Sequence, residues 1–163
     1  MARHGIVILD YGSQFTQLIA RRIRSHGVFS QILPWNATHE RILENEPRGV
    51  ILSGGPASVF EEGAPTLPPD IWSWEVPVLA ICYGMQLVGR DLGFDVVRAG
   101  KAEYGRTSIN ADVNHPLFQG TPREQTVWMS HGDSVRGNGK STAMQVLATS
   151  TSSCHKRLAC QTV

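Results

Sequence analysis

Short apolar runs alternate with amphipathic stretches through the first half of the sequence. Four of these runs are bounded by glycine, proline or polar turn residues, which predicts buried strands at residues 5–9, 28–33, 49–52 and 76–81. The stretches that separate or follow them predict helices at residues 13–27, 38–46 and 85–92. Strands that alternate with helices imply right-handed crossovers, so we predict an α/β fold with an open, mostly parallel sheet and helices on both faces.

The first predicted helix has recognisable ends. Ser13 is a suitable N-terminal cap, and Gly27 is suited to close the helix. The apolar residues that recur with helical spacing should face the sheet; they are Phe15, Leu18, Ile19 and Ile23.

The pattern changes after Gly93, where helical periodicity fades. Short strand-like runs occur instead, at residues 94–98, 107–110, 126–129 and 144–148. Upstream, residues 64–69 contain three prolines and predict a loop inside the domain, because closely spaced prolines exclude a ladder or helix interior.

Composition narrows the class of protein. A chain of 163 residues with 41% hydrophobic and 18% charged residues is suited to one globular domain. A net charge of +1 gives no reason to expect nucleic acid or a membrane as a partner, and no apolar run approaches the length of a bilayer-spanning helix. Three sparse cysteines indicate reduced thiols and no disulfide framework, so we expect a cytoplasmic protein.

Cys82 is the principal candidate for chemistry. It lies at the junction of the fourth predicted strand and the helix that follows, where a sharp turn directs a side chain out of the carboxyl edge of the sheet, as in the nucleophile elbow of hydrolases. The first turn of the helix should favour a thiolate. The alternative is that Cys82 is a small buried hydrophobic residue at a strand end.

A glycine turn strengthens the catalytic interpretation. Gly54, Gly55 and Pro56 follow the neighbouring strand, so they should reach the same edge of the sheet as Cys82. A backbone N–H of Gly55 and that of Tyr83 could together form a two-donor oxyanion hole for acyl transfer.

Several longer motifs occur in one order along residues 5 to about 153, at residues 8–22, 52–59, 81–86, 103–105 and 128–133. With these motifs the chain resembles the glutaminase (class I glutamine amidotransferase) domains of the GMP synthase family. The cysteine and glycine motifs are shared by class I amidotransferases in general, whereas the first and last motifs are specific to the GMP synthase family.

The resemblance implies a role for each motif residue. Cys82 would attack the side-chain amide of glutamine and form a thioester, while the N–H groups of Gly55 and Tyr83 would hold the oxyanion. The α-amino and carboxylate end of glutamine would be bound by Gln86, in the helix after Cys82, and by a second group in a loop that follows a strand. This second group consists of Ser130, Gly132 and Asp133.

The resemblance also implies a partner. Ammonia released from glutamine would be used by an ATP-pyrophosphatase (synthetase) domain or subunit, which aminates XMP to GMP with ATP and Mg²⁺. No glycine-rich phosphate-binding loop with Lys-Ser/Thr occurs in this sequence. We therefore expect neither cofactor nor metal in residues 1–163.

The family places its general base in a late His-Pro-Glu motif, which this sequence lacks. We therefore expect residues 1–153 to be an incomplete amidotransferase domain and residues 154–163 a divergent tail. Two other functions remain open: a non-catalytic glutamine-binding or regulatory fragment, and a cysteine hydrolase of similar fold in which His131 would serve Cys82.

Overall fold

The computed structural model describes residues 4–136, 145–150 and 157–161. The chain divides into two compact units, and each is described here by itself. Unit 1 comprises Met1–Val88 and Gln161–Val163, and unit 2 comprises Gly89–Cys160.

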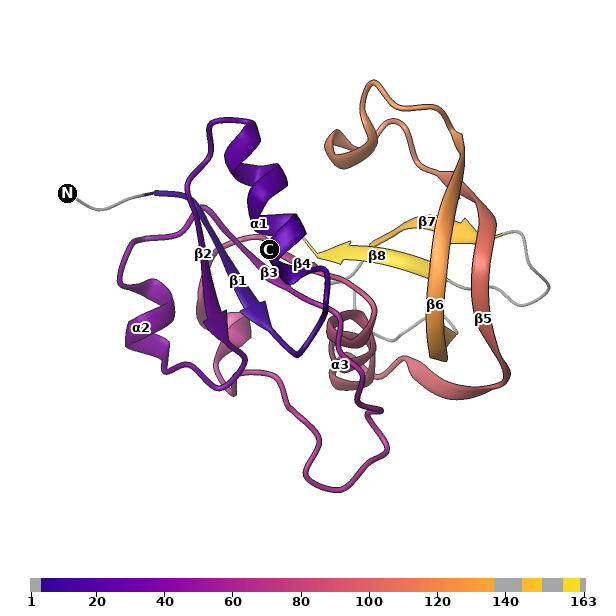
Figure 1. The fold of residues 1–163 in the computed structure, drawn as a ribbon, viewed down its shortest axis with the longest axis horizontal. Coiled ribbons are helices and arrows are strands. Elements are labelled where there is room, and N and C mark those ends of the chain that lie inside the picture. Colours follow the sequence, from indigo (N-terminus) through magenta and orange to yellow (C-terminus); the bar gives the residue numbers. More distant parts are fainter. Residues whose placement is uncertain (1–3, 137–144, 151–156, 162–163) are drawn as a thin grey trace. The chain divides into compact units, whose positions relative to one another are not determined.

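Unit 1 is built on a parallel sheet whose strands are ordered β2-β1-β3-β4 (Figure 1). The four strands coincide with the four predicted from the apolar runs, to within two residues at most ends. Their bounds are Ile6–Asp10 (β1), Ser30–Pro34 (β2), Gly49–Leu52 (β3) and Val78–Ala80 (β4).

Helices cover both faces of this sheet, as predicted. On one face, Ile8 and Ile51 pack against Ala20 of α1 (Thr16–Ser25). Side chains alternate along a strand, so Leu52 faces the opposite side from Ile51. There it meets the start of α3 (Tyr83–Asp91), where a Cβ on Gly84 would lie 2.6 Å from the Leu52 Cβ. Unit 1 is therefore an α/β layer structure with its parallel sheet in the middle.

The predicted start and apolar face of α1 were partly wrong. The helix begins at Thr16, and the Ser13 hydroxyl accepts a hydrogen bond from the Phe15 N–H in a turn that precedes the helix. Phe15 and Leu18 are about half exposed and do not face the sheet. The sheet-facing side of the helix consists of Thr16, Ile19, Ala20 and Ile23. Its predicted end is confirmed, since Gly27 adopts a positive φ of 75° just after the helix.

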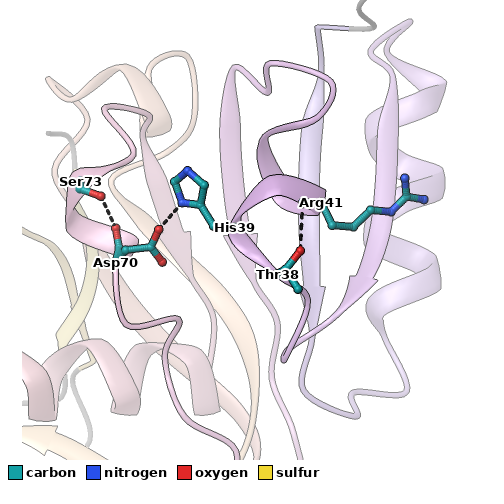
Figure 2. A network of polar contacts seen from close by, with 5 residues as sticks. All are labelled: Thr38, His39, Arg41, Asp70 and Ser73. Carbon is teal, nitrogen blue, oxygen red and sulfur yellow. Dashed lines mark hydrogen bonds and ion pairs between the residues drawn. The ribbon is translucent and has the colours of Figure 1, made fainter.

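A polar network fastens the connection between β3 and β4 to α2 (His39–Leu43), as Figure 2 shows. Thr38 caps α2, with its hydroxyl accepting a hydrogen bond from the Arg41 N–H. The His39 ring contacts the carboxylate of Asp70, which directly precedes the 3-10 helix η1 (Ile71–Ser73). The Ser73 hydroxyl donates to the Asp70 carbonyl at 2.8 Å. Asp70 is therefore held by α2 through its carboxylate and by η1 through its carbonyl.

Unit 2 is antiparallel, with strand order β8-β7-β5-β6. Three of the four predicted short strands were too short, because they fall largely within two long strands that pair with each other across a register shift between Arg98 and Glu103. The fourth, predicted at residues 144–148, corresponds to the short strand Gln145–Ser150. A 3-10 helix, η2, covers Pro116–Phe118. The strands are Asp95–Ala111 (β5), Glu124–Arg136 (β6), Gln145–Ser150 (β7) and Arg157–Gln161 (β8).

Within the described residues, no helix combines the length and apolar character that a membrane crossing would need.

Candidate functional site

Cys82 lies in the turn that links β4 to α3. Its backbone is left-handed, with φ of +47°, a conformation that costs a side-chain-bearing residue about 1–2 kcal/mol. Two hydrogen bonds hold the turn to the end of β3: the Ile81 N–H donates to the Leu52 carbonyl at 2.9 Å, and the Gly84 N–H donates to the Ser53 carbonyl at 3.1 Å. The predicted sharp turn between strand and helix is therefore confirmed.

The glycine turn after β3 reaches the same place. A Cβ on Gly54 would lie 3.3 Å from the Cys82 Cβ, so the two turns lie close together with little room for a side chain between them. Gly55 packs against the backbone of Tyr11, and a Cβ there would lie 2.3 Å from the Tyr11 carbonyl oxygen. This is the adjacency on which the predicted oxyanion hole of Gly55 and Tyr83 depends, and the role of their N–H groups stays a prediction.

Two further residues of α3 are buried beside the cysteine. Gln86 is 5% exposed, and its backbone N–H donates to the Cys82 carbonyl at 3.0 Å as the helix begins. Tyr83 is 1% exposed, and its hydroxyl donates to the Pro65 carbonyl at 2.6 Å. The predicted contact between Gln86 and a substrate remains a prediction.

The second predicted substrate-binding group belongs to unit 2. Ser130, Gly132 and Asp133 lie within β6, whereas we expected a loop after a strand. The pairing with β5 shifts register at this segment, since Asp133 pairs with Arg98 and His131 pairs with Glu103. Asp133 is buried, at 9% exposure, and is paired in register with Arg98. Substrate binding by this group remains a prediction.

Burial raises the pKa of the Cys82 thiol above its usual value, since the charged thiolate loses hydration in the half-buried turn. This shift opposes the sequence-based expectation that the first turn of the helix favours a thiolate. A thiol in this state needs a general base before it can act as a nucleophile at neutral pH.

The raised pKa has a measurable consequence. The folded state holds the Cys82 proton more tightly than an unfolded chain does, so a smaller fraction of thiolate is present at pH 7. We expect the iodoacetamide alkylation rate at Cys82 to keep rising with pH beyond about 8.5, the usual midpoint of a cysteine. Peptide mass spectrometry across pH 6 to 10 measures it. A plateau already reached below that midpoint would contradict the shift.

The left-handed backbone predicts an unusual order of stability. Cys82→Gly and Cys82→Ala both remove the thiol, but only glycine adopts this φ without a Cβ clash. Cys82→Gly should be more stable than Cys82→Ala by about 1 kcal/mol in urea unfolding. At Ala80, in regular strand, the matched change Ala80→Gly should instead lower stability by about 1 kcal/mol. A Cys82→Gly variant less stable than Cys82→Ala would show that the turn is not strained.

The sequence alone assigned no role to Tyr11, Trp35 or Ser53, which lie with Cys82 at the carboxyl edge of the parallel sheet. Tyr11 stacks on Trp35 with ring centroids 6.4 Å apart and tilts against Tyr83 at 5.6 Å. The position of Tyr11 directly after a parallel strand was the available signal, since ligand sites form at such ends. An open hollow of about 470 Å³ lies here, lined by Asp10, Tyr11, Gly12, Ile32, Leu33, Pro34, Trp35 and Pro65.

Among the described residues, no group of three or more His, Cys, Asp or Glu side chains is arranged to hold a metal ion.

A left-handed cysteine between a strand and a helix, with a glycine turn beside it, is the arrangement of a nucleophile elbow in an α/β protein. Residues 7–161 match the family described as "Glutamine amidotransferase class-I". The chain therefore belongs to the class-I glutamine amidotransferase family.

Relatives and solved structures agree with this assignment. "GMP synthase [glutamine-hydrolyzing]" of Fusobacterium nucleatum is 50% identical over 83% of the chain and 27% of that protein. The protein of the same name from Campylobacter lari is 46% identical over 94% of the chain and 30% of that protein. The chain thus spans only about three tenths of the length of these curated relatives.

Among solved structures, a protein from Thermoplasma acidophilum described as a GMP synthase subunit is 29% identical. It superposes with a TM-score of 0.73 over 93% of this chain and 75% of that one. A glutamine amidotransferase from Thermotoga maritima, 21% identical with a TM-score of 0.72, covers 96% of this chain and 70% of that one, and supports the fold.

Proposed function

We propose that this protein hydrolyses glutamine through Cys82 and supplies the ammonia for ATP-dependent amination of XMP to GMP. The observation that supports this most strongly is the left-handed Cys82, presented between a strand and a helix with Gly54 at its side. Membership of the class-I glutamine amidotransferase family supports the substrate, and the name of the half-identical relatives supports the use of the ammonia.

The proposed chemistry begins with the Cys82 sulfur. Once its proton has been removed by a general base, the sulfur attacks the side-chain amide carbon of glutamine, and the carbonyl oxygen becomes an oxyanion that accepts hydrogen bonds from the N–H groups of Gly55 and Tyr83. The C–N bond then breaks and ammonia leaves with a proton from the base. Water hydrolyses the γ-glutamyl thioester to glutamate and restores the thiol.

The other predicted residues would hold the remote end of glutamine. Gln86 would bind from the helix that follows the nucleophile. From β6, Ser130, Gly132 and the Asp133 carboxylate would contact the α-amino and carboxylate groups, with the carboxylate suited to the cationic amine. A substrate fixed at this end reaches the nucleophile in a defined orientation.

The ammonia requires a second catalytic unit. We propose as its partner an ATP-pyrophosphatase (synthetase) domain or subunit that binds ATP and Mg²⁺, because curated relatives named GMP synthase are more than three times as long as the matched segment. The partner would adenylate XMP, and ammonia would displace the adenylate.

Transfer of labelled nitrogen tests the proposal. The complete protein with its synthetase partner is supplied with glutamine labelled with ¹⁵N at the side-chain amide, XMP, ATP and Mg²⁺. We expect ¹⁵N in the amino group of GMP, and no incorporation after Cys82→Ser. If glutamate forms but no ¹⁵N appears in GMP, the protein hydrolyses glutamine, and the proposed use of its ammonia for GMP synthesis is wrong.

Asp133→Asn tests substrate binding. Loss of a charged partner for the α-amino group should raise the KM for glutamine by roughly 10-fold to 100-fold, the equivalent of about 1.5–3 kcal/mol. Synthesis of GMP from free ammonia should change by less than about twofold, since it bypasses glutamine. Steady-state kinetics with each nitrogen source measures both. Equal losses in the two assays would indicate that Asp133 supports the fold and not the substrate.

A further inference from the structure

Two tyrosines, one directly after β1 and one at the start of α3, hold the same loop. The Tyr83 hydroxyl donates to the Pro65 carbonyl at 2.6 Å, and the Tyr11 hydroxyl donates to the adjacent Thr66 carbonyl at 3.1 Å. Both tyrosines are buried, and their rings pack against each other with centroids 5.6 Å apart. The loop therefore fixes Tyr11 and Tyr83 as a pair.

The backbone of Tyr11 in turn holds the glycine turn. Its N–H donates to the Ser53 hydroxyl at 3.0 Å, and that hydroxyl donates to the Gly54 carbonyl at 2.9 Å. Its carbonyl lies so close to Gly55 that no side chain fits between them. The Ser53 hydroxyl thus accepts one hydrogen bond from Tyr11 and donates its own proton to Gly54. The Tyr11 carbonyl packs against Gly55, the next residue of the turn.

Ser53 also connects the glycine turn to the nucleophile. It is fully buried; its N–H donates to the Leu9 carbonyl at 3.0 Å, and its carbonyl accepts from the Gly84 N–H at 3.1 Å. Ser53 therefore joins the ends of β1, β3 and α3 through backbone bonds, and its hydroxyl adds a side-chain contribution to them. Substituting that hydroxyl changes the turn while the strand pairing stays.

We propose that Tyr11 and Ser53 are positioning residues that set the distance between the glycine turn and the Cys82 turn for oxyanion stabilisation. The inference rests on the proposed glutamine hydrolysis. Oxyanion donors act only within a few tenths of an ångström of their productive place, so a chain of bonds that fixes two adjacent turns controls the rate of acyl transfer. Neither side chain needs to touch the substrate for this role.

Two substitutions remove single hydroxyls from this network, and two accompany them as comparisons. Tyr11→Phe deletes the bond to Thr66 and keeps the ring; Ser53→Ala deletes both bonds of its hydroxyl. Ser53→Thr restores a hydroxyl at the same position. Ser73→Ala is the matched control, because it removes a serine hydroxyl bonded to a backbone carbonyl at an exposed position of unit 1.

The experiment compares a reaction that forms an oxyanion with one that does not, in the complete protein. We expect Tyr11→Phe and Ser53→Ala to lower kcat for glutamine hydrolysis by about 10-fold to 100-fold, less than the loss of an oxyanion donor itself, with KM within about threefold. Iodoacetamide alkylation of Cys82 passes through no oxyanion and should stay within about twofold. Ser53→Thr should recover most of kcat, and Ser73→Ala should match the parent.

Each contrary result has a distinct meaning. An unchanged kcat in Tyr11→Phe and Ser53→Ala, while the parent hydrolyses glutamine through Cys82, would overturn the positioning role alone. A parallel fall in alkylation and hydrolysis would also overturn it, because the turn would then be generally disrupted. Absence of Cys82-dependent hydrolysis in the parent would overturn the proposed function and, with it, the positioning claim.

Discussion

Cys82→Ala is expected to lower glutamine-dependent synthesis by on the order of 10³-fold or more, because the sulfur is the atom that forms the covalent intermediate. Free ammonia enters after the thioester chemistry, so ammonia-dependent synthesis in the same variant should stay within about twofold of the parent. Initial rates with glutamine and with an ammonium salt, measured on one preparation, provide the comparison.

Ammonia-dependent synthesis also serves as the folding control for that variant. A Cys82→Ala protein that still uses glutamine at more than about a tenth of the parental rate would show that another group carries the reaction. Loss of both activities would indicate that ammonia-dependent synthesis by the partner depends on the structure of the Cys82 turn and not only on the supply of ammonia.

Gly55→Ala is expected to have the largest effect on stability. The added Cβ would lie 2.3 Å from the Tyr11 carbonyl oxygen, which is a backbone atom and not the end of a flexible side chain, so the glycine turn must move away from Tyr11. Overpacking of this kind costs about 1–3 kcal/mol or more. Urea unfolding should show that loss, and glutamine hydrolysis should fall by on the order of 10²-fold as the turn leaves Cys82.

Gly49→Ala provides the matched comparison within the preceding strand. A Cβ at Gly49 would meet the Ile6 Cδ1 at 3.3 Å, and the end of an isoleucine side chain can yield. We expect a change in stability below about 1 kcal/mol and unaltered hydrolysis. Equal destabilisation by the two alanines would contradict the specific packing of Gly55 against Tyr11.

The hydrophobic pattern was sufficient for the parallel half of the fold. The runs that predicted β1, β3 and β4 are almost purely apolar because helices cover both faces of these strands. The same reasoning predicted the Cys82 turn, since a buried strand followed at once by a helix leaves its junction residue at the carboxyl edge. The positive φ of Cys82 confirms that part of the site.

The antiparallel half was harder to predict because its strands do not carry a continuous apolar pattern. β5 spans 17 residues but includes charged residues and Gly105, whose φ is +118°, so only fragments of it looked strand-like. β8 was not predicted at all; residues 157–161 form a strand by backbone pairing with β7. Pairing between backbones is available to almost any sequence and leaves little trace in composition.

The network around Tyr11 and Ser53 could not be derived from motifs either. Its bonds join side chains to carbonyl and N–H groups of residues 42 and 55 positions away, and such bonds impose no spacing along the sequence. The glycine turn was found because it follows a strand end, and Gln86 was found through the family motif that contains it, whereas the partner of each hydroxyl is set by the three-dimensional fold.

Trapping the acyl-enzyme with hydroxylamine tests the central claim most directly. The complete protein is incubated with glutamine and hydroxylamine, and γ-glutamyl hydroxamate is measured alongside glutamate. A γ-glutamyl thioester on Cys82 predicts hydroxamate formed at the expense of glutamate, with both products lost in Cys82→Ala. Glutamate that forms without hydroxamate, or hydroxamate that persists in Cys82→Ala, would contradict a covalent mechanism through Cys82.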